Sequence, residues 1–514
     1  MTGHSTVEGT VQNVVFRNEE NGYTVLALVT DLGEEVTVVG CIPFAAAGES
    51  MTITGTWVEH ATYGVQLAAE TVDRRMPKDE EEILVYLSSG VLKGVGPATA
   101  ARLVERFGAD TLRVIEEEPE RLTAIKGMTA KKATEISTAF RALTGLRRVT
   151  EFLSRYELPV SMAMSLVRAY GENTLSSLKD NPYLLADDRF GVEFSTADEI
   201  AISMGFGGDD VCRVEAAVLY ELSHNLGNGH VFLPRNKLVA ATAQLIDVDG
   251  DTVEKAVDDL CEGGKTICRP IANVQGCYLR RMYEAETYVA KRLWAACTEE
   301  CEHWVDAGKI IGEIEMQQGV VYAPLQRHAV TLAAEKGVLV LTGGPGTGKT
   351  LIQKAILDIY RRKNPGKEIC CCAPTGRAAR RMEESTGFSS STVHKALGLM
   401  AGEDDEYDGL EMLDADLILA DETSMLDIYL AANLFRAVNA GSQVILVGDA
   451  EQLPSVGPGA VLREIIASNC IPVVRLDKVF RQNKGSRIAI NAKLIRHGNL
   501  SLEYGTDFQF VDSA

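Results

Sequence analysis

Hydrophobic and polar residues alternate in five short stretches within the first 75 residues. The stretches are VEGTVQNVVF, GYTVLALV, EVTVVG, SMTITGTWV and VQLAAETV. Alternation with a period of two is typical of half-buried strands, and the turn signals Asn21-Gly22 and Asp31-Leu32-Gly33 separate the first three stretches. We therefore predict a small antiparallel β-barrel over residues 1–75.

Four aromatic residues of this barrel, Phe16, Tyr23, Trp57 and Tyr63, have two interpretations. Aromatic side chains more often fill the core of a small barrel. On an outer face they stack against the bases of a single-stranded nucleic acid. The sequence leaves both interpretations open.

The apolar residues change to a helical spacing near residue 80, and residues 81–210 are predicted to form a helical domain. The stretch GVLKGVGPATAARLVERFG places the turn Gly94-Val95-Gly96 between two short helices, which is the helix-hairpin-helix pattern. A second, weaker copy, RLTAIKGMTAKKATEIS, turns at Gly127. Backbone N–H groups at such turns hold a DNA phosphate without reading the base sequence.

The charge of the hairpin region differs from that of the whole chain. The chain carries a net charge of −21, which by itself disfavours binding to phosphates. Residues 91–150, in contrast, hold eleven Lys and Arg against seven Asp and Glu, and a local basic region is enough to bind DNA. The predicted DNA contacts here are Gly94, Gly96, Lys126, Lys131 and Lys132. The alternative is a helical connector whose glycines only cap helices.

Two further regions carry less information about chemistry. Residues 150–210 continue the helical pattern, with two loop breaks and no chemical motif. Residues 211–283 are predicted to form a winged-helix-like unit, because helices there precede the strand pair TICRPIANVQGCYLRR. The eleven cysteines are scattered without paired zinc spacing, so we expect reduced thiols packed in the core.

A glycine-rich turn, GGPGTGKT, follows the apolar stretch VLVLT and precedes the helix-forming stretch LIQKAILDIYRR. This pattern, GxxxxGK[ST] between a strand and a helix, predicts a loop whose N–H groups cradle the phosphates of ATP. Lys349 is expected to reach the β- and γ-phosphates, and the Thr350 hydroxyl is expected to bind Mg²⁺. The predicted nucleotide contacts are Gly343, Gly344, Pro345, Gly346, Thr347, Gly348, Lys349 and Thr350. The alternative is a turn that binds nothing.

Polar residues follow further apolar stretches downstream, where the carboxyl ends of parallel strands bind ligands. After DLILA, Asp421 is expected to bind Mg²⁺ through water, and Glu422 to act as the general base that orients the attacking water. After SQVILVGD, Gln452 is expected to sense the γ-phosphate. After PVVRL, Arg481 is expected to act as an arginine finger.

Four other residues of this segment are predicted to contact adenine or a DNA strand. Gln326, upstream of the glycine-rich turn, is expected to read the adenine edge with its amide. Thr375, in the turn after EICCCA, is expected to hold a phosphate of a nucleic-acid strand, and Thr392 and His394 at the next helix start are expected to contact the same strand.

The motifs GGPGTGKT, APTGRAA, STVHKALG, DETSM, LVGDAEQLPSVGPG and VFRQ occur in this order. Together they resemble the motor motifs of superfamily 1 helicases of the RecD-like kind. The stretches NEENGYTV, KGVGPATAARLVERFG, NPYLL and FSTADEIA are similar to the extended RecD-like ATP-dependent DNA helicases, which stand apart from the RecBCD subunit. The resemblance implies an OB-like barrel, tandem helix-hairpin-helix domains and a RecA-like P-loop motor moving 5′→3′ on single-stranded DNA.

The expected fold is therefore a multidomain α/β protein. Residues 284–480 are assigned to the first RecA-like motor domain, and residues 481–514 to the start of a second one, within which we expect the sequence to be truncated. On that expectation the chain as written binds Mg·ATP weakly and does not unwind DNA. The acidic segment between His394 and Asp421 is also shorter than the family pattern, in which a strand-separating β-hairpin is expected there.

The sequence thus predicts an ATP-dependent DNA helicase of repair or recombination, acting as a monomer on single-stranded and tailed duplex DNA. No apolar stretch approaches the roughly 18 residues that span a bilayer, and the N-terminus lacks a secretion signal, so we expect a cytoplasmic protein. Two other classes stay open. One is an ATP-regulated DNA-binding protein that does not translocate, and the other is a small-molecule P-loop kinase, which needs an acceptor lid and neither Gln452 nor the hairpins.

Overall fold

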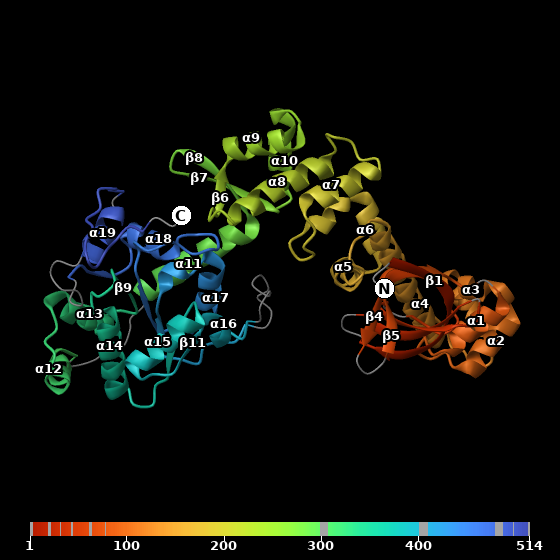
Figure 1. The fold of residues 1–514 in the computed structure, drawn as a ribbon, viewed down its shortest axis with the longest axis horizontal. Helices are drawn as coiled ribbons and strands as arrows, with labels where there is room; N and C mark the ends of the chain where they lie inside the picture. The colour runs from red at the N-terminus through yellow and green to blue at the C-terminus, as the bar shows by residue number, and fades with distance from the viewer. Residues whose placement is uncertain are drawn as a thin grey trace. The chain divides into compact units, whose positions relative to one another are not determined.

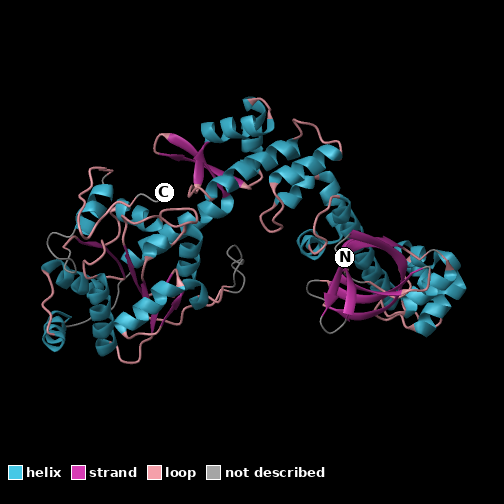
Figure 2. Cartoon of the chain, in the orientation of Figure 1, coloured by secondary structure: helices cyan, strands magenta, loops and turns pink. Residues whose placement is uncertain are grey.

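The computed structural model describes residues 4–18, 22–30, 32–42, 45–60, 64–77, 79–298, 307–399, 410–478, 487–496 and 498–511 (Figures 1 and 2). Tyr63, Arg481 and most of the acidic segment after His394 lie outside these ranges. The chain divides into two compact units, residues 1–216 and residues 217–514. None of the described helices is long and apolar enough to cross a membrane.

Five strands form a closed barrel at the start of the first unit, in the order β1-β2-β3-β5-β4. Their bounds are β1 His4–Arg17, β2 Tyr23–Thr30, β3 Glu35–Cys41, β4 Ser50–His60 and β5 Gly64–Arg75. All five predicted strands are confirmed. Neighbouring strands pair antiparallel except β3 and β5, whose parallel pairing closes the barrel.

Among the described aromatic residues of the barrel, one packs against the core and two are exposed on the surface. Trp57 is half-buried and packs against the apolar core that includes Leu26, Val38 and Leu67. Phe16 and Tyr23 are instead 54% and 42% exposed. Core packing therefore accounts for Trp57, and base stacking stays a prediction for the two exposed rings.

Helices make up the rest of the first unit. Their bounds are α1 Glu80–Ser88, α2 Pro97–Phe107, η1 Gly108–Asp110, α3 Thr111–Glu117, η2 Pro119–Ala124, α4 Ala130–Arg155, α5 Met162–Tyr170, η3 Gly171–Asn173, α6 Thr174–Asp180, η4 Pro182–Ala186, α7 Phe194–Ser203 and α8 Val211–Leu226, which continues into the second unit. Thr129 begins the longest of them, α4, because its side-chain oxygen accepts a hydrogen bond from the Lys132 backbone N–H at 3.2 Å.

These helices contain an internal repeat that the sequence analysis missed. Positions 63 residues apart match in identity and burial: Ala100 with Ala163, Leu103 with Leu166, and Leu122 with Leu185, each fully buried. Two further positions match in geometry, because the Thr111 hydroxyl donates to the Gly108 carbonyl and the Thr174 hydroxyl to the Gly171 carbonyl, both at 2.6 Å. The segment that showed no motif is therefore a second copy of the hairpin pair.

The backbone of the first hairpin is also repeated. Gly94 has a φ of 90°, in the left-handed region that glycine adopts without steric cost, and its counterpart Glu157 has a φ of 56°. The second copy thus keeps the shape of the turn although it has lost the glycine.

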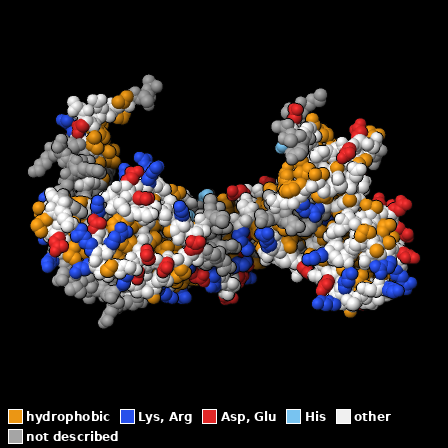
Figure 3. All heavy atoms as spheres, turned by 90° about the horizontal axis from the view of Figure 1, so that it is seen from below, with side chains coloured by type: hydrophobic (Ala, Val, Ile, Leu, Met, Phe, Trp, Pro, Cys, Tyr) orange, Lys and Arg blue, Asp and Glu red, His pale blue; other side chains and the backbone are white. Residues whose placement is uncertain are grey.

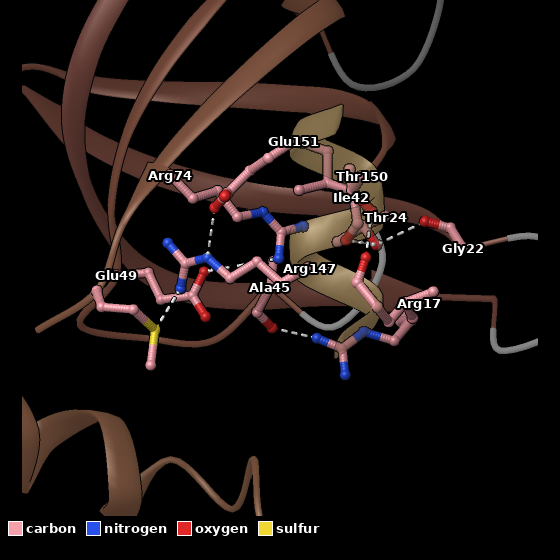
Figure 4. A network of polar contacts seen from close by, with 12 residues as sticks. Arg17, Gly22, Thr24, Ile42, Ala45, Glu49, Arg74, Arg147, Thr150 and Glu151 are labelled. Atoms are coloured by element: carbon pink, nitrogen blue, oxygen red, sulfur yellow. Dashed lines mark hydrogen bonds and ion pairs between the residues drawn. The ribbon is translucent and has the colours of Figure 1, made fainter. Parts of the chain in front are cut away.

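A buried polar network joins the barrel to α4 (Figure 4). The side chains of Glu49 and Arg74 are only 2% and 4% exposed, and the Glu49 carboxylate lies 3.9 Å from the Arg74 guanidinium. Arg147 of α4 donates to the Met76 sulfur at 2.6 Å. Burial raises the pKa of Glu49 and lowers that of Arg74, while each group's charge opposes the shift of the other. The two buried charges therefore depend on each other.

Removing the Glu49 carboxylate is expected to destabilise the first unit. A Glu49→Ala variant would remove the buried anion whose charge opposes the shift of the Arg74 pKa, and losing one partner of a buried ion pair costs about 3–5 kcal/mol. The measurement is urea unfolding followed by Trp57 fluorescence, with Trp294 and Trp304 changed to Phe.

The matched control is Glu151→Ala. Glu151 also pairs with Arg147 but is 44% exposed, so its loss should cost no more than about 1 kcal/mol. Equal destabilisation by the two variants would contradict the role given to the buried pair.

The second unit begins with helices and a small sheet. Their bounds are β6 Phe232–Pro234, α9 Arg235–Ile246, α10 Gly250–Glu262, β7 Thr266–Ile271, β8 Val274–Leu279 and α11 Arg280–Thr298. The predicted strand pair is present as the β7–β8 hairpin. The third strand of the sheet, β6, pairs with β8 and was missed because it has only three residues.

A six-stranded parallel sheet forms the core of the rest of the unit, in the order β11-β10-β12-β13-β9-β14. The strand bounds are β9 Val338–Gly343, β10 Ile369–Ala373, β11 Ser390–Thr392, β12 Leu417–Ala420, β13 Gln443–Gly448 and β14 Val473–Leu476. The helix bounds are α12 Ala307–Gln318, α13 Pro324–Glu335, α14 Lys349–Lys363, α15 Gly376–Thr386, α16 Val393–Ala396, η5 Thr423–Met425, α17 Ile428–Ala437, α18 Val461–Ser468 and α19 Arg487–Arg496. Five of the six strands were predicted, and β11 was not.

Candidate nucleotide and DNA sites

The glycine-rich turn joins the buried strand β9 to α14, as predicted. Gly346 and Gly348 have φ values of 78° and 92°, so the turn requires left-handed backbone at both positions. A side chain at Gly343 would lie 2.6 Å from the Leu476 carbonyl, which explains a glycine at the end of the strand. The first turn of α14 therefore opens onto the loop, where its N–H groups can bind phosphate.

Lys349 is held by the same loop. Its ammonium group donates to the Gly343 carbonyl and, at 3.3 Å, to the Gly344 carbonyl. The side chain is half-buried, so it is already oriented across the loop. Thr350, the next residue, is exposed at the start of α14.

Gln326 lies beside the loop, but its amide already makes two hydrogen bonds. The side chain is buried, its Oε1 accepts from the Ala323 N–H at 2.9 Å, and its Nε2 donates to the Thr347 carbonyl at 3.2 Å. A cavity of about 250 Å³ next to it is lined by Ala323, Pro324, Leu325, Gln326, Thr347, Leu476, Asp477 and Lys478. Gln326 thus links the start of α13 to the loop and faces a mostly apolar space.

Asp421 and Glu422 follow β12 at the carboxyl end of the sheet. The Asp421 carboxylate accepts a hydrogen bond from the Glu422 N–H at 2.9 Å. Burial raises the pKa of Asp421, while the charge of Lys349 opposes that shift, which indicates that the two charges are near each other. Glu422 has a φ of 50°, a strained conformation for a non-glycine residue of the kind that clusters at functional sites.

Gln353 is a residue of this site that sequence reasoning missed. It lies on α14 and is fully buried, and neither its Nε2 nor its Oε1 has a hydrogen-bond partner among the described residues. Its amide is nevertheless close enough to lower the pKa of Asp421. An amide inside an apolar helix was the only sequence signal.

Gln452 lies on the loop after β13. Its Nε2 donates to the Asp449 carboxylate at 3.3 Å, and Asp449 itself is buried, where it also accepts from the Glu451 N–H at 3.1 Å. The Ala450 N–H on the same loop donates to Thr342 of β9 at 3.3 Å. The Gln452 loop is therefore tied to the strand that leads into the glycine-rich turn.

The structure brings Thr375 and Thr392 to one edge of the sheet. They follow β10 and end β11, which pair in parallel with Ala373 opposite Thr392. Each hydroxyl oxygen caps the next helix, accepting from the Ala378 N–H at 3.2 Å and the Lys395 N–H at 3.1 Å respectively. Each hydroxyl thus uses one of its two lone pairs for the cap, and its O–H can still donate. His394 is half-buried in the first turn after Thr392.

The two predicted hairpins of the first unit lie against each other. The Arg102 guanidinium donates to the Lys126 carbonyl at 2.6 Å, and a side chain placed at Gly94 would lie 3.7 Å from the Lys132 side chain. Gly96 caps α2 without a side-chain hydrogen bond, so no capping side chain occupies the first N–H groups of this helix. Lys126 and Lys131 are exposed, and Lys132 is half-buried.

The second copy of the hairpins lacks these features. Helices α4 and α7 begin at Ala130 and Phe194, 64 residues apart, so the second copy has one extra residue before α7. Ser195 and Thr196 therefore stand where the first copy has Lys131 and Lys132. Pro159, which has no N–H group, stands where the first copy has Gly96. On the face drawn in Figure 3, Lys and Arg side chains are interspersed with Asp and Glu on both units. A concentration of donors for phosphate is thus found only at the first copy among these repeats.

The donor set at the nucleotide site fits Mg²⁺. Thr350 offers a hydroxyl and Asp421 a carboxylate, and Mg²⁺ in nucleotide sites takes one or two protein oxygens, with waters and phosphates completing its shell. Within the described ranges no group of three or more His, Cys, Asp and Glu side chains is arranged to hold a metal ion by itself. Burial raises the pKa of Asp421 because it disfavours the charged carboxylate, and a bound cation would offset this effect.

Family models match four parts of the chain. Residues 4–77 match the OB-fold domain of the ATP-dependent DNA helicase YrrC, and residues 87–142 match a SAM-like helix-hairpin-helix tandem. Residues 142–232 match the HHH domain of ATP-dependent RecD2 DNA helicases. Residues 321–512 match an AAA domain. The predicted barrel, hairpins and P-loop domain are thereby confirmed.

Similar proteins agree with these models. The chain is 30% identical to the ATP-dependent RecD2 DNA helicase of Deinococcus radiodurans over 96% of its own length and 70% of that protein. It is 38% identical to the RecBCD enzyme subunit RecD of Mycobacterium tuberculosis over 27% of its own length, which corresponds to 28% of that subunit. A crystal structure of the Pif1 helicase from Candida albicans matches 35% of the chain and 45% of that protein, with 25% identity and a TM-score of 0.26.

The similarity to the Deinococcus protein extends over nearly the whole chain, and it includes the barrel, both hairpin copies and the P-loop domain. A shared P-loop domain alone would not require the two N-terminal modules. The chain belongs to the family of RecD2-like ATP-dependent DNA helicases.

Proposed function

We propose that the protein couples ATP hydrolysis to 5′→3′ movement along single-stranded DNA and to the separation of tailed duplex DNA. The observation that carries the proposal is the position of Lys349, Asp421 and Gln452 on loops at one end of the parallel sheet. Similarity to DNA helicases over the whole chain favours this function over a small-molecule kinase.

The residues of the loop would bind and orient ATP. The backbone N–H groups of residues 343–350, except Pro345, which has none, would surround the phosphates, and the Lys349 ammonium would exchange its carbonyl partners for phosphate oxygens. Adenine would occupy the cavity beside Gln326, whose bonded amide retains one N–H and one lone pair for the base edge. The hydrogen bond from Gln326 to the Thr347 carbonyl would thus connect the adenine cavity to the loop that binds the phosphates.

Hydrolysis would depend on the loops after β12 and β13. Bound Mg²⁺ supplies neutralisation of the charge that develops on the β- and γ-phosphate oxygens. Asp421 and Thr350 would hold the cation, and Gln353 would keep the Asp421 carboxylate oriented. Glu422 would accept the proton of the attacking water, and Gln452 would leave Asp449 to contact the γ-phosphate. Arg481 stays a predicted arginine finger.

DNA would be held at two places of different kinds. Thr375, Thr392 and His394 would contact the strand along which the motor moves, through hydroxyl and imidazole groups at the carboxyl edge of the sheet. The first hairpin copy would hold DNA phosphates through the turn at Gly94 and Gly96 and through its lysines.

The hairpin contacts can be tested by salt dependence. Replacing Lys126, Lys131 and Lys132 with Ala should weaken binding about equally for unrelated DNA sequences, because phosphates are the same in all of them. The slope of log K against log salt concentration should become shallower by roughly 0.7–0.9 for each DNA phosphate that the variant no longer binds.

A matched control changes the second copy, where Lys179 is replaced with Ala. Lys179 is exposed on α6 and should leave the slope unchanged. Equal slopes for the wild-type protein and the triple variant would place the DNA contacts elsewhere, on the barrel or the motor sheet.

The helicase function can be tested by direction. ATP turnover should rise on addition of single-stranded DNA, and the protein should displace streptavidin from the 3′ end of a biotinylated strand faster than from the 5′ end. DNA-stimulated turnover without displacement from either end would favour the ATP-regulated DNA-binding protein. An ATP turnover rate that is the same with and without DNA would favour the small-molecule kinase.

A further inference from the structure

Three cysteines lie together in the second unit, away from the nucleotide and DNA sites. Cys268 of β7 and Cys277 of β8 are directly opposite each other in the antiparallel hairpin, and their sulfurs are 2.6 Å apart. Cys261, near the end of α10, lies 3.2 Å from the Cys268 sulfur and 3.2 Å from the Thr266 hydroxyl. These contacts link the sulfurs in the order Cys261, Cys268 and Cys277, a cysteine row in which Cys268 touches both of the others.

We propose that this row is an oxidation site, at which a low-molecular-weight disulfide such as oxidised glutathione converts Cys268 and Cys277 to a disulfide. A disulfide forms without backbone movement only where the fold already places two Cβ atoms close together and pointing toward each other. The paired register of β7 and β8 places the two cysteines opposite each other, and their sulfurs, 2.6 Å apart, need to approach only to the roughly 2.05 Å of an S–S bond.

The three cysteines differ in their exposure to solvent, and therefore to a dissolved oxidant. Cys261 and Cys268 are half-buried, so an oxidant can reach them, while Cys277 is fully buried. The thiolate, and not the thiol, is the nucleophile in disulfide exchange. The hydrogen bond from Cys268 lowers the pKa of Cys277, and the positive charge of Arg235 acts in the same direction. The Cys277 sulfur lies 2.6 Å from the Cys268 sulfur, so it can attack once the half-buried Cys268 has formed a mixed disulfide.

The exchange balances in two steps. The hydrogen bond with Cys277 raises the pKa of Cys268, so the Cys268 proton first passes to Cys277 across their 2.6 Å contact. The Cys268 thiolate then attacks one sulfur of the oxidant, the S–S bond of the oxidant breaks, and the thiolate that leaves takes up the proton from Cys277. The Cys277 thiolate then attacks the Cys268 sulfur of this mixed disulfide, and the second thiolate leaves. The two cysteines lose two protons and two electrons, and the oxidant is reduced to two thiols. Cys261 can next attack Cys268 and transfer the bond to itself without further oxidation.

A metal site is the other common use of clustered cysteines, and the geometry does not favour it here. Within the described ranges no group of three or more ligand side chains is arranged around a space for a metal ion. Two thiolates on one tetrahedral zinc ion, each about 2.3 Å from it, lie roughly 3.8 Å apart, whereas the Cys268 and Cys277 sulfurs are only 2.6 Å apart. The row suits sequential exchange.

The experiment equilibrates the reduced protein with buffers of increasing oxidised glutathione, stops the reaction with acid, and alkylates the remaining thiols. Trypsin then releases Cys268 and Cys277 in one peptide, residues 266–280, because the Arg269–Pro270 bond resists cleavage. We expect this peptide to become two hydrogen atoms lighter and unalkylated. This should occur in a more reducing buffer than the one in which the exposed Cys470 gains glutathione.

The variants separate this outcome from general thiol reactivity. Cys277→Ser should abolish the lighter peptide and leave glutathione on Cys268 or a link to Cys261, whereas the half-buried Cys212→Ser should change nothing. Alkylation of both Cys268 and Cys277 in every buffer overturns the proposal, as does finding them only as separate glutathione adducts. The wild-type titration alone decides the question if Cys277→Ser does not fold.

Discussion

Replacing Lys349 with Ala is expected to remove ATP turnover and to weaken ATP binding about 10- to 100-fold. A charge-assisted hydrogen bond contributes about 1.5–3 kcal/mol, and each 1.4 kcal/mol corresponds to a factor of ten. Turnover should fall further than binding, because the ammonium group also faces the charge that develops during phosphoryl transfer. Binding is measured with a fluorescent ATP analogue, and turnover by phosphate release with saturating single-stranded DNA.

The Lys349 side chain also supports the loop itself. It does not point into solvent but bonds to the Gly343 and Gly344 carbonyls, so the variant removes a brace of the loop as well as a phosphate ligand. The control is Lys354→Ala, one turn further along α14, which removes a lysine of the same helix without touching the loop. Circular dichroism separates loss of the site from loss of the fold. Unchanged ATP affinity in Lys349→Ala would disprove the assigned site.

Replacing Glu422 with Gln is expected to lower ATP turnover by about 10²- to 10⁴-fold, the contribution of a positioned general base, while ATP binding is retained. The substitution keeps the shape of the side chain, and the strained backbone, with a φ of 50°, is equally accessible to Gln and Glu. Only the ability to accept a proton is removed. Single-turnover hydrolysis and equilibrium binding of the ATP analogue are measured on the same preparation.

Glu451→Gln is the matched control for Glu422. Glu451 is an exposed carboxylate on the neighbouring loop after β13, where its backbone N–H, and not its side chain, bonds to Asp449. Its loss should leave turnover within about threefold of the wild-type value, since substitutions of exposed side chains outside a site change little. A Glu422→Gln variant that turns over ATP as fast as this control would transfer the role of general base to another residue.

The parts of the fold that could be predicted were those with a strong local pattern. The five barrel strands alternate with a period of two, and the strands of the parallel sheet are continuous apolar runs. The elements that were missed, β6 and β11, have three residues each, which is too short for any periodicity to be visible.

The nucleotide residues were predictable because the P-loop spacing itself encodes the backbone conformation. What could not be predicted is how side chains are used before a ligand arrives. The Gln326 amide, predicted to read adenine, already donates to the Thr347 carbonyl. The Gln452 amide, predicted to sense the γ-phosphate, already donates to the Asp449 carboxylate. Gln353 was invisible for a different reason, since its burial near Asp421 results from packing between α14 and β12.

The second hairpin copy was also missed for a physical reason. The positions that agree between the copies are small or apolar residues such as Ala100 and Leu103, which are common in any helix. Their agreement becomes informative only when burial and hydrogen bonds agree at the same spacing. The motifs NPYLL and FSTADEIA gain a structural explanation, because Tyr183 and Arg213 both donate to the Asp198 carboxylate, at 2.7 and 2.8 Å.

The two hairpin copies share their buried apolar residues but differ at the positions that would bind phosphate. After duplication, the buried alanines and leucines stayed the same in both copies, whereas a glycine became Glu157 and two lysines have polar uncharged counterparts. A left-handed glutamate is costlier than a left-handed glycine, so the tertiary structure of the second copy alone maintains the bend. The same turn is therefore built in both copies, with and without the residues that would bind phosphate.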